Sequence, residues 1–535
     1  MLQAGCVLER RSSGEDSGLA RAWGAHLLAG RRFQKLRSAA WRERLFKRRT
    51  VVWVAILAFF GFIVYALYPP PTQAAVFAPS VGWTVQVDGL PAHPWPLPAN
   101  ANGNLSGVSC LSDRFCEAVG ELISPGLGGL LALAYRGGRW YDQAIPAVPR
   151  GVKSSGAGNT VLPGNLDQVS CATEVFCVAV GYISQPPPQI ALPRGLSPAY
   201  VRAMDFGNVS EPMVGIYNGA SWTLQMLSGP FWSGRLAGVS CPAVRFCMAV
   251  GERKVIGGVS GKRFKTLQFK STPMTFTYNG RGWAFTKIPA SLDRASFYSV
   301  SCVTTSFCEA VGYGSASLTS ALNGNTDAAI AKYDGKTWVA QALPVQVSGA
   351  ALYGVSCVSR VFCEAVGKGH PTLAIRRVHG HEKMTLGTRR PLVEEYNGAS
   401  WSTQAASPIR VAPELATSLD TVSCASVTFC EAIGTWSNSY GMGAPLSEGY
   451  DGRRWVVQGN PLEPPYNYKG FNAYGLGPVF YSVTVLYDVS CTRSACEAVG
   501  VISPKQGADT RLYRAALIER HTSFSSHPSR VGIHR

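Results

Sequence analysis

The sequence predicts an all-β fold of seven similar units, each a sheet of four antiparallel strands, preceded by one transmembrane helix. Three observations lead to this prediction. A phrase of the form VSC…FC…AVG occurs seven times, a phrase of the form Tyr-x-Gly…Trp follows six of its copies, and one uncharged apolar stretch precedes them all. Such a repeat sets the architecture of the whole chain, because each copy is one supersecondary unit.

The N-terminal part of the chain is basic and then apolar. Residues 1–50 form an arm with twelve Lys and Arg against four Asp and Glu, and residues 51–68 follow without a charge. At helical rise, that apolar length is close to the thickness of a bilayer's hydrocarbon layer. No Lys or Arg follows until Arg114, so we expect the arm in the cytoplasm and the rest of the chain outside. A signal peptide cleaved near residues 72–74 is the alternative.

Fourteen of the fifteen cysteines stand in pairs within the VSC…FC phrases, and Cys6 in the arm is the one left over. Thiols oxidise outside the cytoplasm, so we predict one disulfide in each unit. Zinc binding is the alternative, but no pair has histidines at a regular distance. The predicted bridges are Cys110–Cys116, Cys171–Cys177, Cys241–Cys247, Cys302–Cys308, Cys357–Cys363, Cys424–Cys430 and Cys491–Cys496.

Each unit contains two predicted hairpins. The strand ending in VSC pairs with the strand beginning at FC across a short turn, which places the two cysteines on facing strands. In the second hairpin, Asn-Gly or Asp-Gly between apolar runs is a strong turn signal, because such turns need positive φ. The second hairpins lie at Tyr135/Trp140, Tyr217/Trp222, Tyr278/Trp283, Tyr333/Trp338, Tyr396/Trp401 and Tyr450/Trp455.

Seven four-stranded units predict a seven-bladed β-propeller. A solenoid would need shorter and more even repeats, and separate small domains would need linkers. Trp83-x-x-Gln86 matches the fourth-strand pattern of five other units, whereas the segment after the seventh cysteine pair has no Trp. We therefore expect the N-terminal strand to complete the last blade and close the ring. The predicted organisation is a cytoplasmic arm (1–50), a transmembrane helix (51–68), a Pro-rich linker (69–80), the propeller (81–525) and a tail (526–535).

The glycine-ended strand followed by Tyr-Asp or Tyr-Asn and then Trp resembles the kelch repeat, with AVG or AIG in place of the double glycine of kelch units. The Asp-Gly turns at Asp334 and Asp451 are similar to the Asp-boxes of sialidases, which place one residue between Asp and Gly. The VSC…FC…AVG pattern as a whole is similar to repeats in uncharacterised exported proteins of high-GC bacteria. That resemblance implies a compartment and no activity.

Residues that recur in every unit occupy symmetry-related places, so we assign them structural roles. The Tyr and Trp rings are expected to pack between neighbouring blades. The glutamates directly after the second cysteine are expected to form hydrogen bonds from one blade to the next. These glutamates are Glu117, Glu309, Glu364, Glu431 and Glu497.

Function is then expected where the copies differ, in the loops between the second and third strands, which lie on one face of the ring. Two of these loops are basic and predict an acidic partner. The candidate ligand-binding residues are Arg253, Lys254, Lys262, Arg263, Lys265, Arg376, Arg377, Lys383, Arg389 and Arg390. A solvated loop without a ligand is the alternative.

These features predict a membrane-anchored, extracytoplasmic binding or scaffolding module for an anionic cell-envelope polymer or a protein partner. The alternative is a polysaccharide-processing enzyme of a sialidase-like or lyase-like kind, whose catalytic residues the sequence does not identify. No nucleophile elbow, P-loop or dinucleotide fingerprint is present. We predict no cofactor, no metal at His370, His379, His381 and Glu382, and no nucleic-acid partner, because the arm holds much of the positive charge. The oligomeric state stays open.

Overall fold

The computed structural model describes residues 83–88, 102–124, 127–146, 164–185, 209–231, 233–260, 266–314, 327–343, 349–378, 381–406, 416–437, 443–458, 483–503 and 515–522. All of them belong to the second of two compact units, residues 79–535. The predicted arm, transmembrane helix, linker and tail lie outside the described residues. Among the described residues, no helix has the length and apolar character needed to cross a bilayer.

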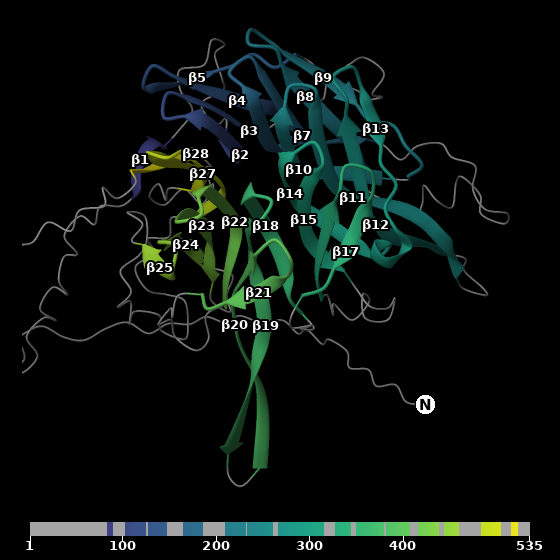
Figure 1. The fold of residues 1–535 in the computed structure, drawn as a ribbon, viewed down its shortest axis with the longest axis vertical. Helices are drawn as coiled ribbons and strands as arrows, with labels where there is room; N and C mark the ends of the chain where they lie inside the picture. The colour runs from purple at the N-terminus through teal and green to yellow at the C-terminus, as the bar shows by residue number, and fades with distance from the viewer. Residues whose placement is uncertain are drawn as a thin grey trace, which may run out of the picture. The chain divides into compact units, whose positions relative to one another are not determined.

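The described residues form seven four-stranded antiparallel sheets, which confirms the predicted propeller (Figure 1). Blades 1 to 3 are β2 (Asn102–Ser112), β3 (Phe115–Ser124), β4 (Leu127–Arg136), β5 (Arg139–Asp142); β6 (Gly164–Thr173), β7 (Phe176–Gln185), β8 (Val209–Tyr217), β9 (Trp222–Met226); and β10 (Ser233–Ala243), β11 (Phe246–Ser260), β12 (Thr266–Tyr278), β13 (Trp283–Phe285). Blades 4 and 5 are β14 (Ala295–Thr304), β15 (Phe307–Gly314), β16 (Asp327–Tyr333), β17 (Trp338–Gln341); and β18 (Ala351–Ser359), β19 (Phe362–Val378), β20 (His381–Tyr396), β21 (Trp401–Gln404). Blade 6 is β22 (Ala416–Ser426), β23 (Phe429–Ser437), β24 (Gly443–Tyr450) and β25 (Trp455–Gln458).

Blade 7 closes the ring as predicted. Its strands are β26 (Val483–Cys491), β27 (Ala495–Ser503), β28 (Ala515–Thr522) and, from the start of the ring domain, β1 (Trp83–Asp88). β1 pairs antiparallel with β28, and Trp83 lies opposite His521. The inner strands contact one another from blade to blade, including β2 of blade 1 against β26 of blade 7. A closed ring leaves no blade without two neighbours.

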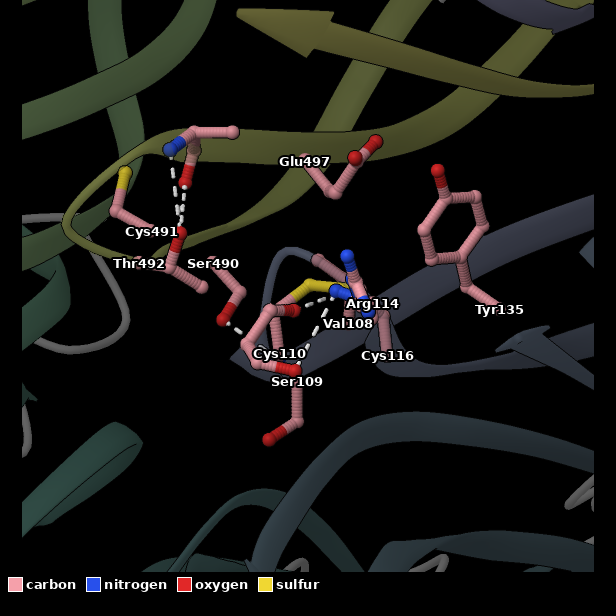
Figure 2. Close-up of a disulfide and its surroundings, with 12 residues drawn as sticks. Val108, Ser109, Cys110, Arg114, Cys116, Tyr135, Ser490, Cys491, Thr492 and Glu497 are labelled. Atoms are coloured by element: carbon pink, nitrogen blue, oxygen red, sulfur yellow. Dashed lines mark hydrogen bonds between the residues drawn. A yellow bond between two sulfur atoms is a disulfide. The ribbon is translucent and has the colours of Figure 1, made fainter. Parts of the chain in front are cut away.

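The seven predicted disulfides all form, each within the first hairpin of a blade. In six blades the turn between the cysteines holds five residues, and in blade 7 it holds four. Figure 2 shows the Cys110–Cys116 bridge beside Ser490 and Cys491 of blade 7. Each bridge fixes the register of one inner hairpin, where a slip of one residue would turn every side chain to the wrong face.

A second set of bonds joins each blade to the next through the serine of the VSC phrase. Its hydroxyl oxygen accepts a hydrogen bond from the backbone N–H of the first cysteine of the following blade. The seven N···O distances are Cys171–Ser109 3.0 Å, Cys241–Ser170 2.9 Å, Cys302–Ser240 2.9 Å, Cys357–Ser301 2.9 Å, Cys424–Ser356 2.9 Å, Cys491–Ser423 2.9 Å and Cys110–Ser490 2.9 Å. We call this set the serine ring.

Farther from the axis, the Trp side chains lie in hydrophobic clusters that combine two blades, as predicted. Trp222 of blade 2 belongs to one cluster with Phe115 and Val119 of blade 1. In four blades the indole N–H also donates to the glutamine three residues after the Trp of the preceding blade: Trp140 to Gln86 at 3.3 Å, Trp222 to Gln143 at 2.7 Å, Trp401 to Gln341 at 2.7 Å and Trp455 to Gln404 at 2.9 Å. Blade 3 carries Thr286 at this place, and the indole N–H groups of Trp338, Trp283 and Trp83 have no hydrogen-bond partner among the described residues.

The repeated glutamates are buried. The prediction that they form hydrogen bonds to the next blade is wrong for Glu117 and Glu431, whose hydrogen bonds stay within one blade. Glu117 pairs with Arg136 of its own blade, and Glu431 accepts from Gln458 of its own blade at 2.7 Å. Glu431 also lies across the blade boundary from the His521 imidazole, with N and O 3.7 Å apart. Arg136 lies on the third strand of its blade and Gln458 on the fourth, so both partners come from the outer strands of the same sheet.

Every inner strand also has a β-bulge four residues before its first cysteine, for example at Asp167 between the paired residues Leu166 and Gln168. The bulge pushes the inner strand against the second strand, at the glycine of AVG. A Cβ atom on Gly181 would lie 1.9 Å from the Asn165 carbonyl oxygen, and the other six glycines meet the same obstacle. The single glycine of the repeat is therefore a consequence of the bulge.

The ring has two different faces. On the tight-turn face lie the disulfide turns and the Tyr–Trp turns, which touch within a blade: a Cβ atom on Gly219 would lie 2.8 Å from the Val175 side chain. In blades 2 to 6 the Tyr–Trp turns are four-residue loops, whereas blade 1 has a two-residue turn, Gly137-Gly138, between the paired Arg136 and Arg139. In blade 1 both turn glycines have positive φ, whereas in blade 2 Gly219 has φ 91° and the Asn218 side chain accepts the N–H groups of Ala220 and Ser221.

On the opposite face, which we call the loop face, inner strands begin and second strands end. The structure corrects the prediction that both basic segments are loops. In blade 3 and blade 5, the second and third strands continue past the sheet as two-stranded hairpins, which we call arms. Figure 1 shows the long β19–β20 arm extending from the ring. In it, Arg376 pairs with Lys383 and Arg377 pairs with Glu382.

Candidate binding site at the loop-face mouth

Within the sheets, the seven blades differ most where the inner strands reach the loop face. The bulge residues are Ser106, Asp167, Ala237, Tyr298, Tyr353, Asp420 and Tyr487. Two residues before each bulge stands a residue that pairs with the one after the AVG glycine: Asn104↔Glu121, Asn165↔Tyr182, Arg235↔Glu252, Ser296↔Tyr313, Ala351↔Lys368, Ser418↔Thr435 and Val485↔Val501. Bulges commonly re-aim side chains beside functional sites.

Polar contacts connect these residues through blades 1 to 3. Asn165 donates to Ser106 at 3.2 Å and to Asp167 at 2.7 Å. Asp167 in turn accepts two hydrogen bonds from the Arg235 guanidinium, at 2.7 and 2.8 Å. Arg235 also lies over the Tyr182 ring, 5.2 Å from its centre. Because a bidentate pair fixes both partners, this part of the mouth is held in one geometry.

The chain of contacts continues through blades 4 to 6. Ser296 donates to the Glu252 carboxylate at 3.0 Å, and the Tyr298 ring lies 5.4 Å from Tyr313 and 5.5 Å from Tyr353. The Lys368 ammonium lies 5.4 Å from the Tyr353 ring centre. In blade 6, Ser418 donates to Asp420 at 3.0 Å. We call this connected set, from Ser106 to Asp420, the mouth network.

The mouth network combines aromatic faces with hydrogen-bonding groups of both charges. Its carboxylates are Asp167, Asp420, Glu121 and Glu252; its cations are Arg235 and Lys368, with Arg253 and Lys254 directly beyond at the base of the β11–β12 arm. Tyr298 keeps 36% of its surface exposed and Tyr487, the bulge residue of blade 7, keeps 38%. Burial raises the pKa of Asp420 to about 6, although the hydrogen bond from Ser418 and the charge of Lys368 oppose that rise. Convergent aromatic and polar groups of this kind make the mouth the candidate binding site.

The predicted ligand-binding residues lie at the outer edge of this site. Arg253 donates to Thr272 at 3.0 Å and lies over the Phe285 ring. Lys254 and Arg390 are exposed. Lys262, Arg263 and Lys265 lie outside the described residues, and for Arg376, Arg377, Lys383 and Arg389 only the backbone positions in the β19–β20 arm are described. Their role in binding stays a prediction.

Metal ligation has no support among the described side chains, where no group of three His, Cys, Asp or Glu residues is close enough to hold an ion. His370, His379, His381 and Glu382 lie outside the residues whose side chains are described. Sequence reasoning missed the mouth network itself. Its signal was present: between the invariant phrases, the residue four positions before the first cysteine changes from copy to copy.

Fold and site together define a closed seven-bladed propeller with an asymmetric aromatic and polar mouth. No family model matches the chain, and no curated protein matches it, so the kelch resemblance stays a prediction. Among solved structures, the chain is similar to YCF48 from Cyanidioschyzon merolae, with TM-score 0.41 and 13% identity over 82% of this chain and 99% of that one. It is also similar to an ulvan lyase of polysaccharide lyase family PL25, with TM-score 0.41 and 9% identity over 78% and 94% of the two chains. A third is the endosialidase of phage phi92, with TM-score 0.34 and 9% identity over 69% and 68%.

Proposed function

We propose that the protein is a membrane-anchored, extracytoplasmic binding module that holds a cell-envelope polysaccharide at its loop-face mouth. The observation that carries this proposal is the mouth network, which breaks the sevenfold symmetry of an otherwise repetitive ring. A single ligand needs such an asymmetric set, because a residue repeated in every blade would offer seven equal places.

The chemistry of the mouth suits a polyhydroxylated chain. The exposed faces of Tyr298 and Tyr353 would pack against the C–H faces of sugar rings. Asp167, Arg235 and the Ser296–Glu252 pair supply donors and acceptors for hydroxyl groups. Since the network offers donors and acceptors of both charges, binding at the mouth does not require a charged ligand.

An acidic polymer gains further contacts from the arms. Arg253 and Lys254 stand where the β11–β12 arm leaves the sheet, and both arm segments are rich in Lys and Arg. A polymer with uronate or phosphate groups would therefore be drawn to this face by long-range attraction, which salt screens. We propose such a polymer as the preferred ligand.

The proposed compartment is supported by the seven disulfides, because bridges of this number persist in oxidising surroundings. The apolar segment at residues 51–68 supports an anchor with the ring outside.

Binding of the full chain in detergent to neutral and acidic envelope polysaccharides, measured by calorimetry, tests this function. We expect Tyr298→Ala and Tyr353→Ala each to weaken binding about three- to tenfold, because an aromatic contact contributes about 0.5–1.5 kcal/mol. Tyr141→Ala is the matched control, since Tyr141 is 50% exposed on the outer strand of blade 1. Raised salt should weaken binding of the acidic polymer only. Unchanged affinity in both mouth variants would refute the proposal.

A second candidate function is polysaccharide processing, and Asp420 is the observation that favours it. With its pKa raised to about 6, this carboxyl group exchanges a proton near neutral pH beside the tyrosines of the mouth. Release of reducing ends, or of unsaturated products, by the wild type but not by Asp420→Asn would support an enzyme. No release from any bound polymer would leave the binding function alone.

A further inference from the structure

The tight-turn face carries a surplus of exposed positive charge. Nine exposed basic side chains lie on its turns: Arg114, Arg139, Arg245, Arg281, Lys336, Arg360, Arg453, Arg454 and Arg493. The exposed acidic ones are four, Asp113, Glu174, Asp334 and Asp451. Asp334 and Asp451 accept backbone N–H groups within their own turns, at 2.8 to 2.9 Å. The outward field of this face is therefore basic.

The same face also exposes aliphatic side chains. Five of the large apolar residues that stay solvent-exposed lie in the disulfide turns: Leu111 at 40%, Val175 at 62%, Val244 at 43%, Val361 at 62% and Val427 at 48%. Leu111, Val244 and Val361 share a turn with Arg114, Arg245 and Arg360, and for the other two a basic turn residue lies in the same or the neighbouring blade. Between blades 1, 6 and 7 the face is hollowed by a depression of about 480 Å³, lined by Leu111, Ser112, Thr492 and Arg493 among others. Mixed aliphatic and basic groups on one face are typical of proteins that bind a membrane surface.

The chain enters the ring on this face. β1 begins at Trp83, which pairs with His521; His521 in turn pairs with Cys496, the second cysteine of blade 7, beside the disulfide turn. In the sequence, fourteen residues, 69–82, separate the apolar segment from Trp83. Fully extended, such a segment spans at most about 50 Å.

We propose that the tight-turn face docks on the surface of a bilayer containing anionic phospholipids. Charge complementarity is provided by the basic turns, the exposed aliphatic side chains reach the boundary of the headgroups, and the short connection to the predicted anchor keeps this face close to the membrane. The proposal uses the predicted anchor but not the proposed ligand of the mouth. Its consequence is an orientation, since the loop face and the mouth network then point away from the membrane.

Arginine footprinting of the full chain tests the docking. The chain is placed in lipid nanodiscs of phosphatidylcholine alone or with added phosphatidylglycerol, and labelling by phenylglyoxal is followed by mass spectrometry. We expect Arg114, Arg360 and Arg493 to be labelled at least fivefold more slowly in the anionic discs, and added salt to reverse the difference. Arg390, exposed on the loop face, is the internal control and should not change.

Two variants separate docking from other causes of protection. In Arg114→Glu/Arg360→Glu/Arg493→Glu, the remaining Arg245 and Arg281 should be labelled equally in both kinds of disc. The matched loop-face variant, Lys254→Glu/Arg390→Glu, should keep the protection. Equal labelling of the wild type in both discs would overturn the proposal. Protection already complete in detergent would also overturn it, because a second copy of the chain or a bound acidic peptide would then cover the face.

Discussion

Replacing Ser170 with alanine removes one acceptor from the serine ring and leaves the backbone N–H of Cys241 without its partner. That bond is 2.9 Å long, and Cys241 is only 5% exposed, so water does not readily replace the lost oxygen. A buried hydrogen bond contributes about 1 kcal/mol, and an unsatisfied buried donor costs about 1–3 kcal/mol. We therefore expect a loss of about 1–3 kcal/mol between blades 2 and 3.

Hydrogen exchange measured by mass spectrometry checks this locally. A loss of about 1–3 kcal/mol corresponds to about 5- to 150-fold faster opening, which should appear in peptides that contain the Cys241 amide and not in those of blade 6. Ser400→Ala is the control, because Ser400 is exposed and its backbone N–H and carbonyl, which the substitution keeps, make its hydrogen bonds to Asn397. If the Cys241 peptide exchanges at the wild-type rate, the serine ring does not hold the blades together and the reasoning fails.

Three other substitutions have expected outcomes. Gly181→Ala should prevent folding or cost more than about 3 kcal/mol, because its Cβ would lie 1.9 Å from a carbonyl oxygen; Gly129→Ala, with 3.9 Å of room, should be tolerated in the same urea titration. The double variant Cys241→Ala/Cys247→Ala should lose about 2 kcal/mol by loop entropy, and a wild-type urea midpoint would contradict this. Burial raises the pKa of Glu309 from 4.5 to about 8, so the folded state binds the proton more tightly and stability falls as pH rises from about 4.5 to about 8. Glu309→Gln should remove that fall, on the order of 3 kcal/mol at pH 7, whereas the exposed control Glu174→Gln should keep it.

Repetition made the fold predictable from the sequence. Seven copies of one phrase fixed the number of blades, paired cysteines fixed the inner hairpins, and Trp83 without a partner copy at the C-terminal end indicated the closing strand. Each of these signals is local, and the repeat multiplies it sevenfold. The structural reason for the AVG glycine was not predictable, because the bulge that requires it leaves no composition signal of its own.

Partners across the ring were harder to predict than elements. Glutamates on a central strand were expected to bind the next blade, yet Glu117 and Glu431 turn to their own sheets. The residues that do join the blades, Ser170 and Trp222 with their counterparts, were visible only as repeated letters. Which blade a side chain faces depends on the twist and tilt of the strands, and the local sequence does not predict these.

Repeated and variable positions of the chain have different roles. Repeated positions, such as Ser170 and Gly181, hold the seven sheets in a closed ring. A substitution at such a position is expected to lower stability whichever blade carries it. Variable positions, such as the bulge residues Tyr298 and Asp420, lie in the same inner strands, three residues before the serine of the serine ring. A bulge suits this arrangement because its extra residue makes no pair in the ladder, so its side chain can change without disturbing the register of the strand. The asymmetry of the mouth is therefore compatible with the symmetry of the frame, and a ligand that needs one unique site finds it where the ladder is interrupted.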